Sequence, residues 1–325
     1  MPKPWDVWKI IREIDLEAVR AEADRSFRVL VLDEVAGDAE SLARLLTGGR
    51  KGERHPWLVP AHADLRPPLA PLPDVAVLVS READLPPRLG IAAQALAAQK
   101  VPLVTVVVGS GSSTDGVVGP GEAARASIAR AAADDLPAVA QALLSGTPAG
   151  LRLALGRQLP PVRDPLFAAL IEETARANAV YSLGTGVAEA IPLLNLPLNL
   201  ADLVVLTKNQ VVMSYRIALG AGRRGTVRAV LGQTLAVIGS GFMLRQLARQ
   251  LVGLVPVVGI APKVAVAYAG TWAVGRAVAV WAGGGAEVTK ASVARYYAEA
   301  LDRGRRVAEA LTHAARATAA FKRKK

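Results

Sequence analysis

Four carboxylates cluster in one short segment, directly after an apolar run that predicts a buried strand at 27–32. They are Asp33, Glu34, Asp38 and Glu40, and a predicted helix follows at 39–47. A strand, a short loop and a helix form a frame in which proteins commonly bind phosphate, through backbone N–H groups, a lysine and a Mg²⁺-binding hydroxyl. Because this frame carries acids, its chemistry favours the exclusion of phosphate.

The charge of this acidic cluster predicts that a triphosphate does not bind there, since we expect no cation to offset the acids. Like charges a few ångströms apart at a partly buried site repel each other by on the order of several kcal/mol. The alternative is that the carboxylates hold a divalent metal ion. Acidic residues near a helix N-terminus are also ordinary, because they interact favourably with the helix dipole. We therefore expect no metal and no cofactor.

The segment resembles the start of Era-like GTPase domains, in which a strand precedes the pattern GxxxxGKSSLLNALLG. In that register the two glycines fall on Asp33 and Asp38. The lysine falls on Ala39, and the Mg²⁺-binding hydroxyl falls on Glu40. The positions that follow the pattern are Ser41, Leu42, Leu46 and Gly48. The resemblance implies an α/β, P-loop GTPase-like fold with a parallel sheet. It also implies no GTP binding, because the phosphate loop is degenerate; that loop consists of Asp33, Gly37, Asp38, Ala39, Glu40 and Ser41.

Other catalytic motifs are missing from the sequence as well. GTPases place Asn-Lys-x-Asp after a strand to recognise guanine, whereas the predicted strand at 101–108 is followed by the loop GSGSSTDG at 109–116. The similar-looking TKNQ at 207–210 lacks the aspartate and lies in a predicted helical region. The chain has no cysteine, its three histidines are scattered and no GxSxG motif occurs. We therefore expect a protein that is not an enzyme.

Alternating strands and helices in the first half would position the acidic cluster. We predict strands at 27–32, 74–80 and 101–108, helices at 39–47, 86–99 and 123–144, and a loop at 55–73. This alternation is typical of a parallel sheet covered by helices. From residue 151 onward only helical patterns occur, with helices predicted at 163–181 and 287–320. The predicted organisation is an N-terminal amphipathic helix at 1–25, a GTPase-like α/β domain at 26–146 and a separate all-α domain at 147–325, with a linker at 145–150.

Positive charge is concentrated in the helical part. Residues 203–325 hold 19 Lys/Arg and 4 Asp/Glu, whereas residues 1–202 hold 20 and 24. Between Leu203 and Ala286 there is no acid, and the nine cations are Lys208, Arg216, Arg223, Arg224, Arg228, Arg245, Arg249, Lys263 and Arg276. An apolar segment with only positive charges is attracted to an anionic surface, either lipid headgroups or nucleic acid. The alternative is a solvated basic face on a helical bundle.

A second pattern lies within 155–222 and has the form LxKxQxxMxxxIAxxxG. It is matched by Leu206, Lys208, Gln210, Met213, Ile217, Ala218 and Gly220, and Gly-rich apolar helices follow it. In pattern and order, roughly residues 155–300 resemble the helical domain of unknown function that follows GTPase domains in bacterial YcjF-like membrane proteins. This resemblance implies an architecture and a tendency to associate with membranes, but no reaction.

Neither apolar segment of the helical part is a clear membrane span. The first, 229–244, has 16 residues without charge and would reach about 24 Å, short of a hydrocarbon core of about 30 Å. The second, 264–285, has 22 residues but contains Arg276 near its middle, where a charge costs a few kcal/mol. Three arrangements stay open for 229–285: helices that span or enter the membrane, a bundle on its cytoplasmic face, or a buried soluble core.

The sequence therefore predicts a non-catalytic, membrane-associated scaffold or interaction protein. We expect it on the cytoplasmic side of the cell membrane, integral or peripheral, because no signal peptide is evident at the N-terminus. Its expected partners are an anionic membrane surface and an unidentified protein or a second copy of the chain. The alternative is a soluble cytoplasmic protein that binds nucleic acid or protein through Arg303, Arg305, Arg306 and the tail at 322–325. Nucleic acid is the weaker alternative, because aromatic residues are not interleaved with these cations.

Overall fold

The computed structural model describes residues 14–48, 55–64, 71–109, 122–129, 133–189, 200–226, 229–230, 232–233, 260–284 and 288–322. The chain forms two compact units. One, the α/β unit, consists of Arg20–Leu166 with Gly220–Gly222, and the other, the helical unit, consists of Met1–Val19, Phe167–Leu219 and Arg223–Lys325. Most of the predicted helix at 1–25 lies outside the described residues, as do the loop at 110–116 and the tail at 323–325; α2 (Leu16–Ala23) is the described part of that helix.

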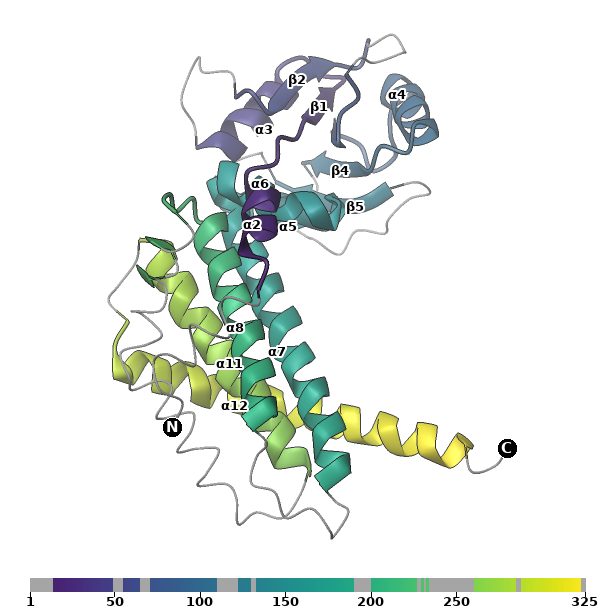
Figure 1. Ribbon diagram of the computed structural model, residues 1–325. Helices are drawn as coiled ribbons and strands as arrows, with labels where there is room; N and C mark the ends of the chain where they lie inside the picture. The colour runs from purple at the N-terminus through teal and green to yellow at the C-terminus, as the bar shows by residue number, and fades with distance from the viewer. Residues whose placement is uncertain are drawn as a thin grey trace. The chain divides into compact units, whose positions relative to one another are not determined.

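The α/β unit is built on a five-stranded sheet in which all neighbouring strands are parallel (Figure 1). Its strand order is β2-β1-β3-β4-β5. The strands are β1 (Val29–Asp33), β2 (Leu58–His62), β3 (Val75–Ser80), β4 (Leu103–Val108) and β5 (Glu122–Ile128). Every residue of β1 and β3 is buried, as expected for inner strands of a parallel sheet with both faces covered. The predicted α/β fold class is thus confirmed.

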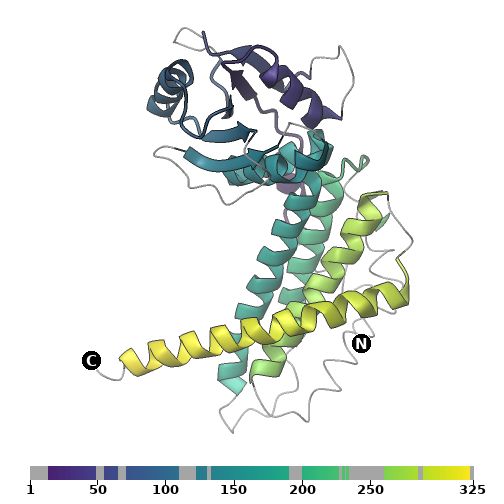
Figure 2. The ribbon, with the colours of Figure 1, turned by 180° about the vertical axis from the view of Figure 1, so that it is seen from behind.

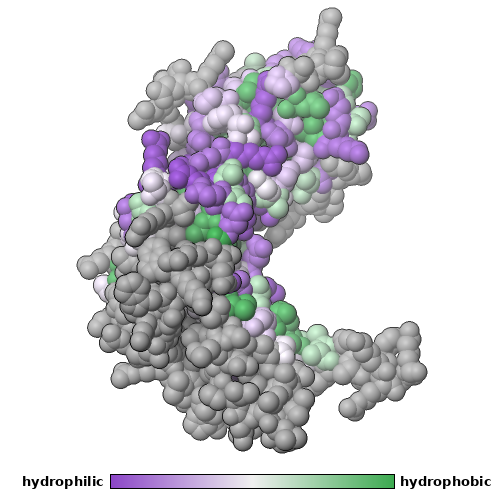
Figure 3. Space-filling model, in the orientation of Figure 1, coloured by the Kyte–Doolittle hydropathy of each residue, from purple (hydrophilic) through white to green (hydrophobic). Residues whose placement is uncertain are grey.

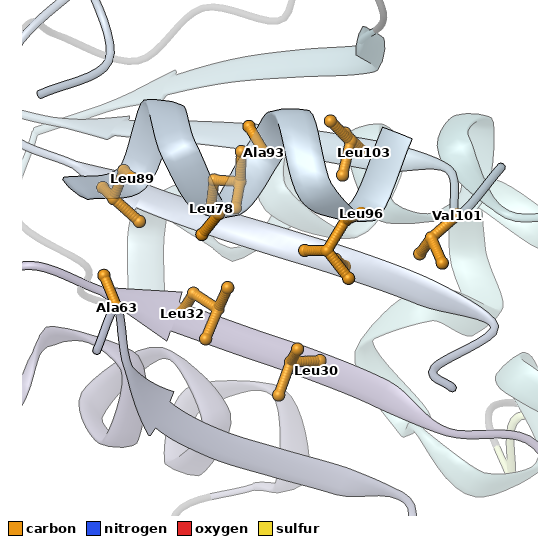
Figure 4. Packing of buried hydrophobic residues seen from close by; sticks show 11 residues of the cluster. Leu30, Leu32, Ala63, Leu78, Leu89, Ala93, Leu96, Val101 and Leu103 are labelled. Carbon is orange, nitrogen blue, oxygen red and sulfur yellow. The ribbon is translucent and has the colours of Figure 1, made fainter. Parts of the chain in front are cut away.

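Helices supply the apolar surfaces that bury the sheet. They are α3 (Asp38–Thr47), α4 (Pro87–Ala98) and α5 (Leu136–Gly146), and α6 (Ala149–Gln158) follows α5. Figure 4 shows Leu89, Ala93 and Leu96 of α4 pointing at the sheet. They pack there against leucines of β1, β3 and β4, so this face holds a hydrophobic core of the unit. On the outer surface seen in Figure 3, hydrophilic residues are interspersed with apolar ones.

Two strands differ from the sequence prediction. The segment 55–73, predicted as a loop because of its prolines, contains the strand β2. This strand forms one edge of the sheet, where Pro60 can lack an N–H without leaving an inner neighbour unpaired. The helix predicted at 123–144 is wrong at its start, since β5 occupies Glu122–Ile128 and α5 begins at Leu136. Its alanines suggested a helix, but Ala124, Ala126 and Ile128 are buried in alternation, which is the period of a strand.

The segment 145–150 was predicted as a linker but is packed into the α/β unit. A Cβ atom on Gly146 would lie 2.3 Å from Cγ2 of Val104 in β4, so only glycine fits at the end of α5. Helix α6 starts at Ala149, and its Leu153 and Leu155 are buried. The compact α/β unit accordingly extends to Leu166.

The helical unit contains α7 (Arg163–Glu189), α8 (Leu200–Gly220), α11 (Ile260–Ala282) and α12 (Lys290–Lys322). Among the described residues after Leu151 helices occur and no strand does, as predicted. Helices α7, α8 and α11 lie side by side, and α12 crosses them (Figures 1 and 2). At the crossing a Cβ on Gly304 would lie 2.6 Å from the carbonyl oxygen of Ala265, so glycine allows α12 to approach the backbone of α11 closely.

Candidate functional site

The acidic cluster lies at the point of the sheet where α/β proteins usually bind ligands. From β1 the chain goes first to β2 on one side and later to β3 on the other side. Ligands of open α/β sheets bind at the carboxyl ends of the strands where the strand order reverses in this way. Asp33 ends β1, Ser80 ends β3, and α3 begins at Asp38 between them. The location is that of a ligand site, and the side chains decide what it can hold.

Asp33 fills the hydrogen-bonding positions that a bound anion would use. Its side chain is buried, and Oδ2 accepts hydrogen bonds from the backbone N–H groups of Gly37 at 3.1 Å and Ala39 at 2.9 Å. Successive N–H groups at the start of a helix form a concave site for anions. Here the chain's own carboxylate occupies that site.

The second oxygen of Asp33 contacts a histidine from the neighbouring strand. His62 Nδ1, at the end of β2, lies 2.8 Å from Asp33 Oδ1. An ionised carboxylate can only accept a hydrogen bond, so Nδ1 carries the proton and donates it. Both carboxylate oxygens of Asp33 are therefore engaged within the protein.

The backbone of the loop is shaped to bring these donors together. Gly37 has φ 96°, in the left-handed region that other residues rarely adopt, and it caps the N-terminus of α3. Ser41 Oγ donates to the carbonyl oxygen of Gly37 at 2.7 Å. The glycine and the serine of the predicted loop thus stabilise the turn, and the hydroxyl proton of Ser41 is used within the protein.

Asp38 is paired with a cation from the end of β3. Arg81 donates from Nε to Oδ2 at 2.9 Å and from a terminal nitrogen to Oδ1 at 3.0 Å, which is the two-bond geometry favoured by guanidinium and carboxylate. The hydrogen bond to Asp38 raises the pKa of the Arg81 guanidinium. This pair lies across the β1/β3 switch point, where a nucleotide phosphate would otherwise be expected.

The loop that carries Arg81 is itself held by a buried ion pair. Arg125 of β5 donates to both oxygens of Glu122, at 3.0 and 2.6 Å, and to the carbonyl oxygen of Ala83 at 2.8 Å. Thr105 Oγ1 of β4 donates to the same carboxylate at 2.8 Å. The hydrogen bond to Ala83 fixes the chain two residues after Arg81, and this helps to position the Arg81 guanidinium against Asp38.

A cavity of about 520 Å³ lies beside the loop, between α3 and β2. Its polar lining includes Asp33, Glu40, Thr47, His55 and His62. Glu40 is exposed, and burial lowers the pKa of His55, which favours its neutral form. No group of three or more His, Asp or Glu side chains within the described ranges is arranged to hold a metal ion.

The expectation that no cation offsets the acids is wrong. Arg81 neutralises Asp38, and His62 donates to Asp33. Both partners were missed because they are far away in sequence and are brought close only by the pairing of β2 and β3 with β1. The one sequence signal for such a partner was Arg81, a cation directly after a predicted inner strand. Glu34 and Glu40 remain near the loop without a cation partner among the described residues.

Two residues of the LxKxQxxMxxxIAxxxG pattern, Gln210 and Met213, contact neighbouring helices of the helical unit. Gln210 Nε2 on α8 donates to Thr271 Oγ1 on α11 at 3.2 Å, and Asn178 of α7 donates to the same oxygen at 2.9 Å. Asn209 completes this amide–hydroxyl network by donating to Asn178 Oδ1 at 2.7 Å. Asn178 and Thr271 are fully buried, so the network joins three helices through satisfied polar groups.

Small residues set the distances between the same helices. A Cβ on Gly275 would lie 2.5 Å from Cγ1 of Ile171 and 3.1 Å from Cε of Met213, a residue of the pattern. Among the described residues one helix, Lys263–Ala282 within α11, is long and apolar enough to cross a membrane, and most of it is buried inside the unit. Core helices of soluble proteins have the same properties. The other segment considered as a span, 229–244, lies almost entirely outside the described residues.

Comparison of the chain with protein-family models, with curated proteins and with solved structures found no match.

Proposed function

We propose that this protein is a non-catalytic scaffold whose α/β unit is a GTPase-like domain that does not bind nucleotide. The observation that carries the proposal is the carboxylate of Asp33, which accepts the N–H groups of Gly37 and Ala39. A phosphate at this loop would have to displace a buried carboxylate, and the loop has no lysine that would compensate for its charge. Loss of nucleotide binding leaves the α/β unit as an interaction domain.

The Asp38–Arg81 pair supports the absence of nucleotide without depending on the GTPase-like origin. Order 2-1-3-4-5 is also the flavodoxin-like order, in which the ligand binds at the same switch point between β1 and β3. In this chain the Asp38–Arg81 pair lies across that point. A phosphorylated ligand of either type would meet a carboxylate that is already paired with its arginine.

A direct test is the release of phosphate from Mg²⁺–GTP and Mg²⁺–ATP by the purified full chain. We expect a rate equal to that of a protein-free blank. A sample of Asp33→Ala, prepared in the same way, controls for traces of contaminating nucleotidases, because such contaminants would be the same in both preparations. Turnover that is present in the natural chain and absent in this variant would refute the proposal.

The proposed site of action is the cytoplasmic face of a membrane. Supporting features are the absence of acids between Leu203 and Ala286, the nine cations in that stretch and the apolar composition of the helices. Arg276 is exposed on α11, and an unpaired charge facing lipid at mid-membrane would cost a few kcal/mol. Peripheral attachment of the helical unit is therefore favoured over insertion of α11.

Fractionation of cells that express the full chain tests this location. A peripheral protein is expected in the membrane fraction at low salt and in the supernatant after a high-salt wash. Retention through both high salt and alkaline carbonate would show insertion instead. Recovery in the soluble fraction at low salt would exclude membrane association.

The second candidate is a soluble basic protein that binds nucleic acid or protein. It is favoured by the burial of most of α11, which is typical of a core helix. Its test is the binding of a duplex oligonucleotide over a series of salt concentrations. Contact with several phosphates predicts a steep fall of affinity with salt.

A further inference from the structure

Helices α11 and α12 bring three arginines together on two aromatic rings. The guanidinium carbons of Arg276 and Arg303 lie 5.7 and 5.4 Å from the ring centre of Trp272. Arg276 also lies 5.9 Å from the ring of Tyr296, and Arg295 lies 5.4 Å from that ring. Arg276 and Arg303 thus lie against the same indole ring.

Arg276 and Arg303 lie on the surface of the helical unit. Both residues are exposed, and within the described part of the chain neither has a carboxylate at ion-pair distance. Arg295 is also exposed and has a loose pair with Glu299, at 3.7 Å. A bound anion would offset the positive charge that these arginines place around the two rings.

The aromatic rings hold these cations in place without neutralising them. A guanidinium stacks on the face of Trp or Tyr through the ring quadrupole, and this contact leaves its N–H donors free at the edge. Tyr296 is buried and Trp272 is half-buried, so both rings are fixed by the packing of α12 on α11. The guanidinium groups are therefore positioned before any ligand arrives, which lowers the entropic cost of binding.

We propose that Arg276, Arg295 and Arg303, with Trp272 and Tyr296, form a binding site for the headgroup of an anionic phospholipid. The proposal rests on the membrane association put forward above, and it assigns that association to one face of the helical unit. Trp and Tyr rings are enriched at the level of lipid headgroups, and arginine pairs with phosphate through two parallel hydrogen bonds. The stretch 203–286, to which Arg276 belongs, contains no acid that would oppose an anionic surface.

The test is flotation of the full chain with vesicles of phosphatidylcholine, with and without phosphatidylserine, at moderate ionic strength. The double variant Arg276→Gln and Arg303→Gln is compared with the natural chain. We expect its partition coefficient on the anionic vesicles to fall about thirtyfold. That equals about 2 kcal/mol at 1.4 kcal/mol per tenfold, the attraction of two basic side chains to an anionic surface.

The matched control is Arg224→Gln with Arg305→Gln, which removes two exposed charges of the helical unit that are not part of the proposed site. Arg305 is two residues after Arg303 and thus about 200° around α12, on the other side of the buried stripe. The control is expected to lose about threefold or less, since its charges act only at a distance. Far-UV circular dichroism and melting curves verify that both variants fold, and Arg276→Lys with Arg303→Lys is expected to regain part of the binding.

The outcomes separate the site from the proposed function. Failure of the natural chain to float with anionic vesicles would overturn both the site and membrane association. Equal flotation of the natural chain and the Arg276/Arg303 variant, or equal losses in this variant and the control, would overturn the site alone. If the natural chain binds duplex DNA but not vesicles, and the Arg276/Arg303 variant loses the DNA binding, the same arginines would be reassigned to nucleic acid.

Discussion

Replacement of Asp33 by alanine is expected to destabilise the α/β unit by about 3–5 kcal/mol. The change leaves two backbone donors at the start of α3, on Gly37 and Ala39, without their acceptor. A buried donor that loses its partner costs about 1–3 kcal/mol, and more where the partner was charged. His62 loses a partner as well, but it is half-exposed and water can replace the carboxylate.

The assay is hydrogen exchange of the amides of β1 as a function of urea, because it follows the α/β unit separately from the helical unit. Asp33→Asn serves as an intermediate case, since an amide oxygen can still accept from both N–H groups but carries no charge. We expect it to cost about 1–2 kcal/mol.

Glu40→Ala is the matched control for Asp33→Ala. It removes a carboxylate from the first turn of α3, which follows the loop after Asp33, but from an exposed position whose side chain makes no hydrogen bond within the described residues. Only its interaction with the helix dipole is lost, about 0.3–1 kcal/mol. If Asp33→Ala cost no more than Glu40→Ala, the carboxylate would not be holding the loop, and the reasoning would fail.

Three further predictions concern packing and pH. Gly304→Ala is expected to lower the stability of the helical unit by about 1–3 kcal/mol in urea unfolding, since the new Cβ would clash with the carbonyl oxygen of Ala265. Gly184→Ala is the control: this glycine lies in open space on α7, and the variant should gain about 0.5–1 kcal/mol in the same experiment. Thr271→Val should cost about 2–3 kcal/mol by the same assay, because two amide donors lose their shared acceptor, and a neutral result would contradict the network. Burial lowers the folded-state pKa of His55, so its contribution to stability is present above about pH 6.5 and declines as the pH falls below that value. His55→Gln should flatten this decline in unfolding curves recorded between pH 7.5 and 5.5. An unchanged dependence of stability on pH would refute the role of His55.

The inner strands could be predicted from the sequence, whereas the edge strands could not. Apolar runs at 27–32, 74–80 and 101–108 become β1, β3 and β4, because strands buried on both faces contain almost only apolar residues. Strands β2 and β5 form the two edges of the sheet and are only half-buried. Their composition, with proline in one and alanine in the other, therefore lacks the apolar signal.

The residues of the candidate site could be predicted, but their partners could not. The position of Asp33, Asp38 and Glu40 in a strand–loop–helix frame is visible in the sequence. The pairing of Asp33 with His62, 29 residues away, and of Asp38 with Arg81, 43 residues away, depends on the order of strands in the sheet. The sequence therefore indicated repulsion of phosphate, whereas the structure adds a carboxylate that takes the place of the phosphate.

In the helical unit the sequence indicated small residues and close packing without identifying the contacts. Gly275 and Gly304 are two of many glycines in the sequence. Only the structure shows that Gly275 of α11 lies against α7 and α8, and that Gly304 of α12 lies against α11. The three arginines around Trp272 and Tyr296 are likewise spread over 276–303 in sequence, and the packing of α12 on α11 unites them.

We propose that the carboxylate of Asp33 takes the place of a nucleotide phosphate, and calorimetric titration of the full chain with Mg²⁺–GTP tests this proposal. We expect no saturable heat with GTP, GDP or ATP at concentrations that would detect a millimolar Kd. A saturable, one-to-one heat with GTP would contradict it, because the nucleotide would then have displaced Asp33 from Gly37 and Ala39.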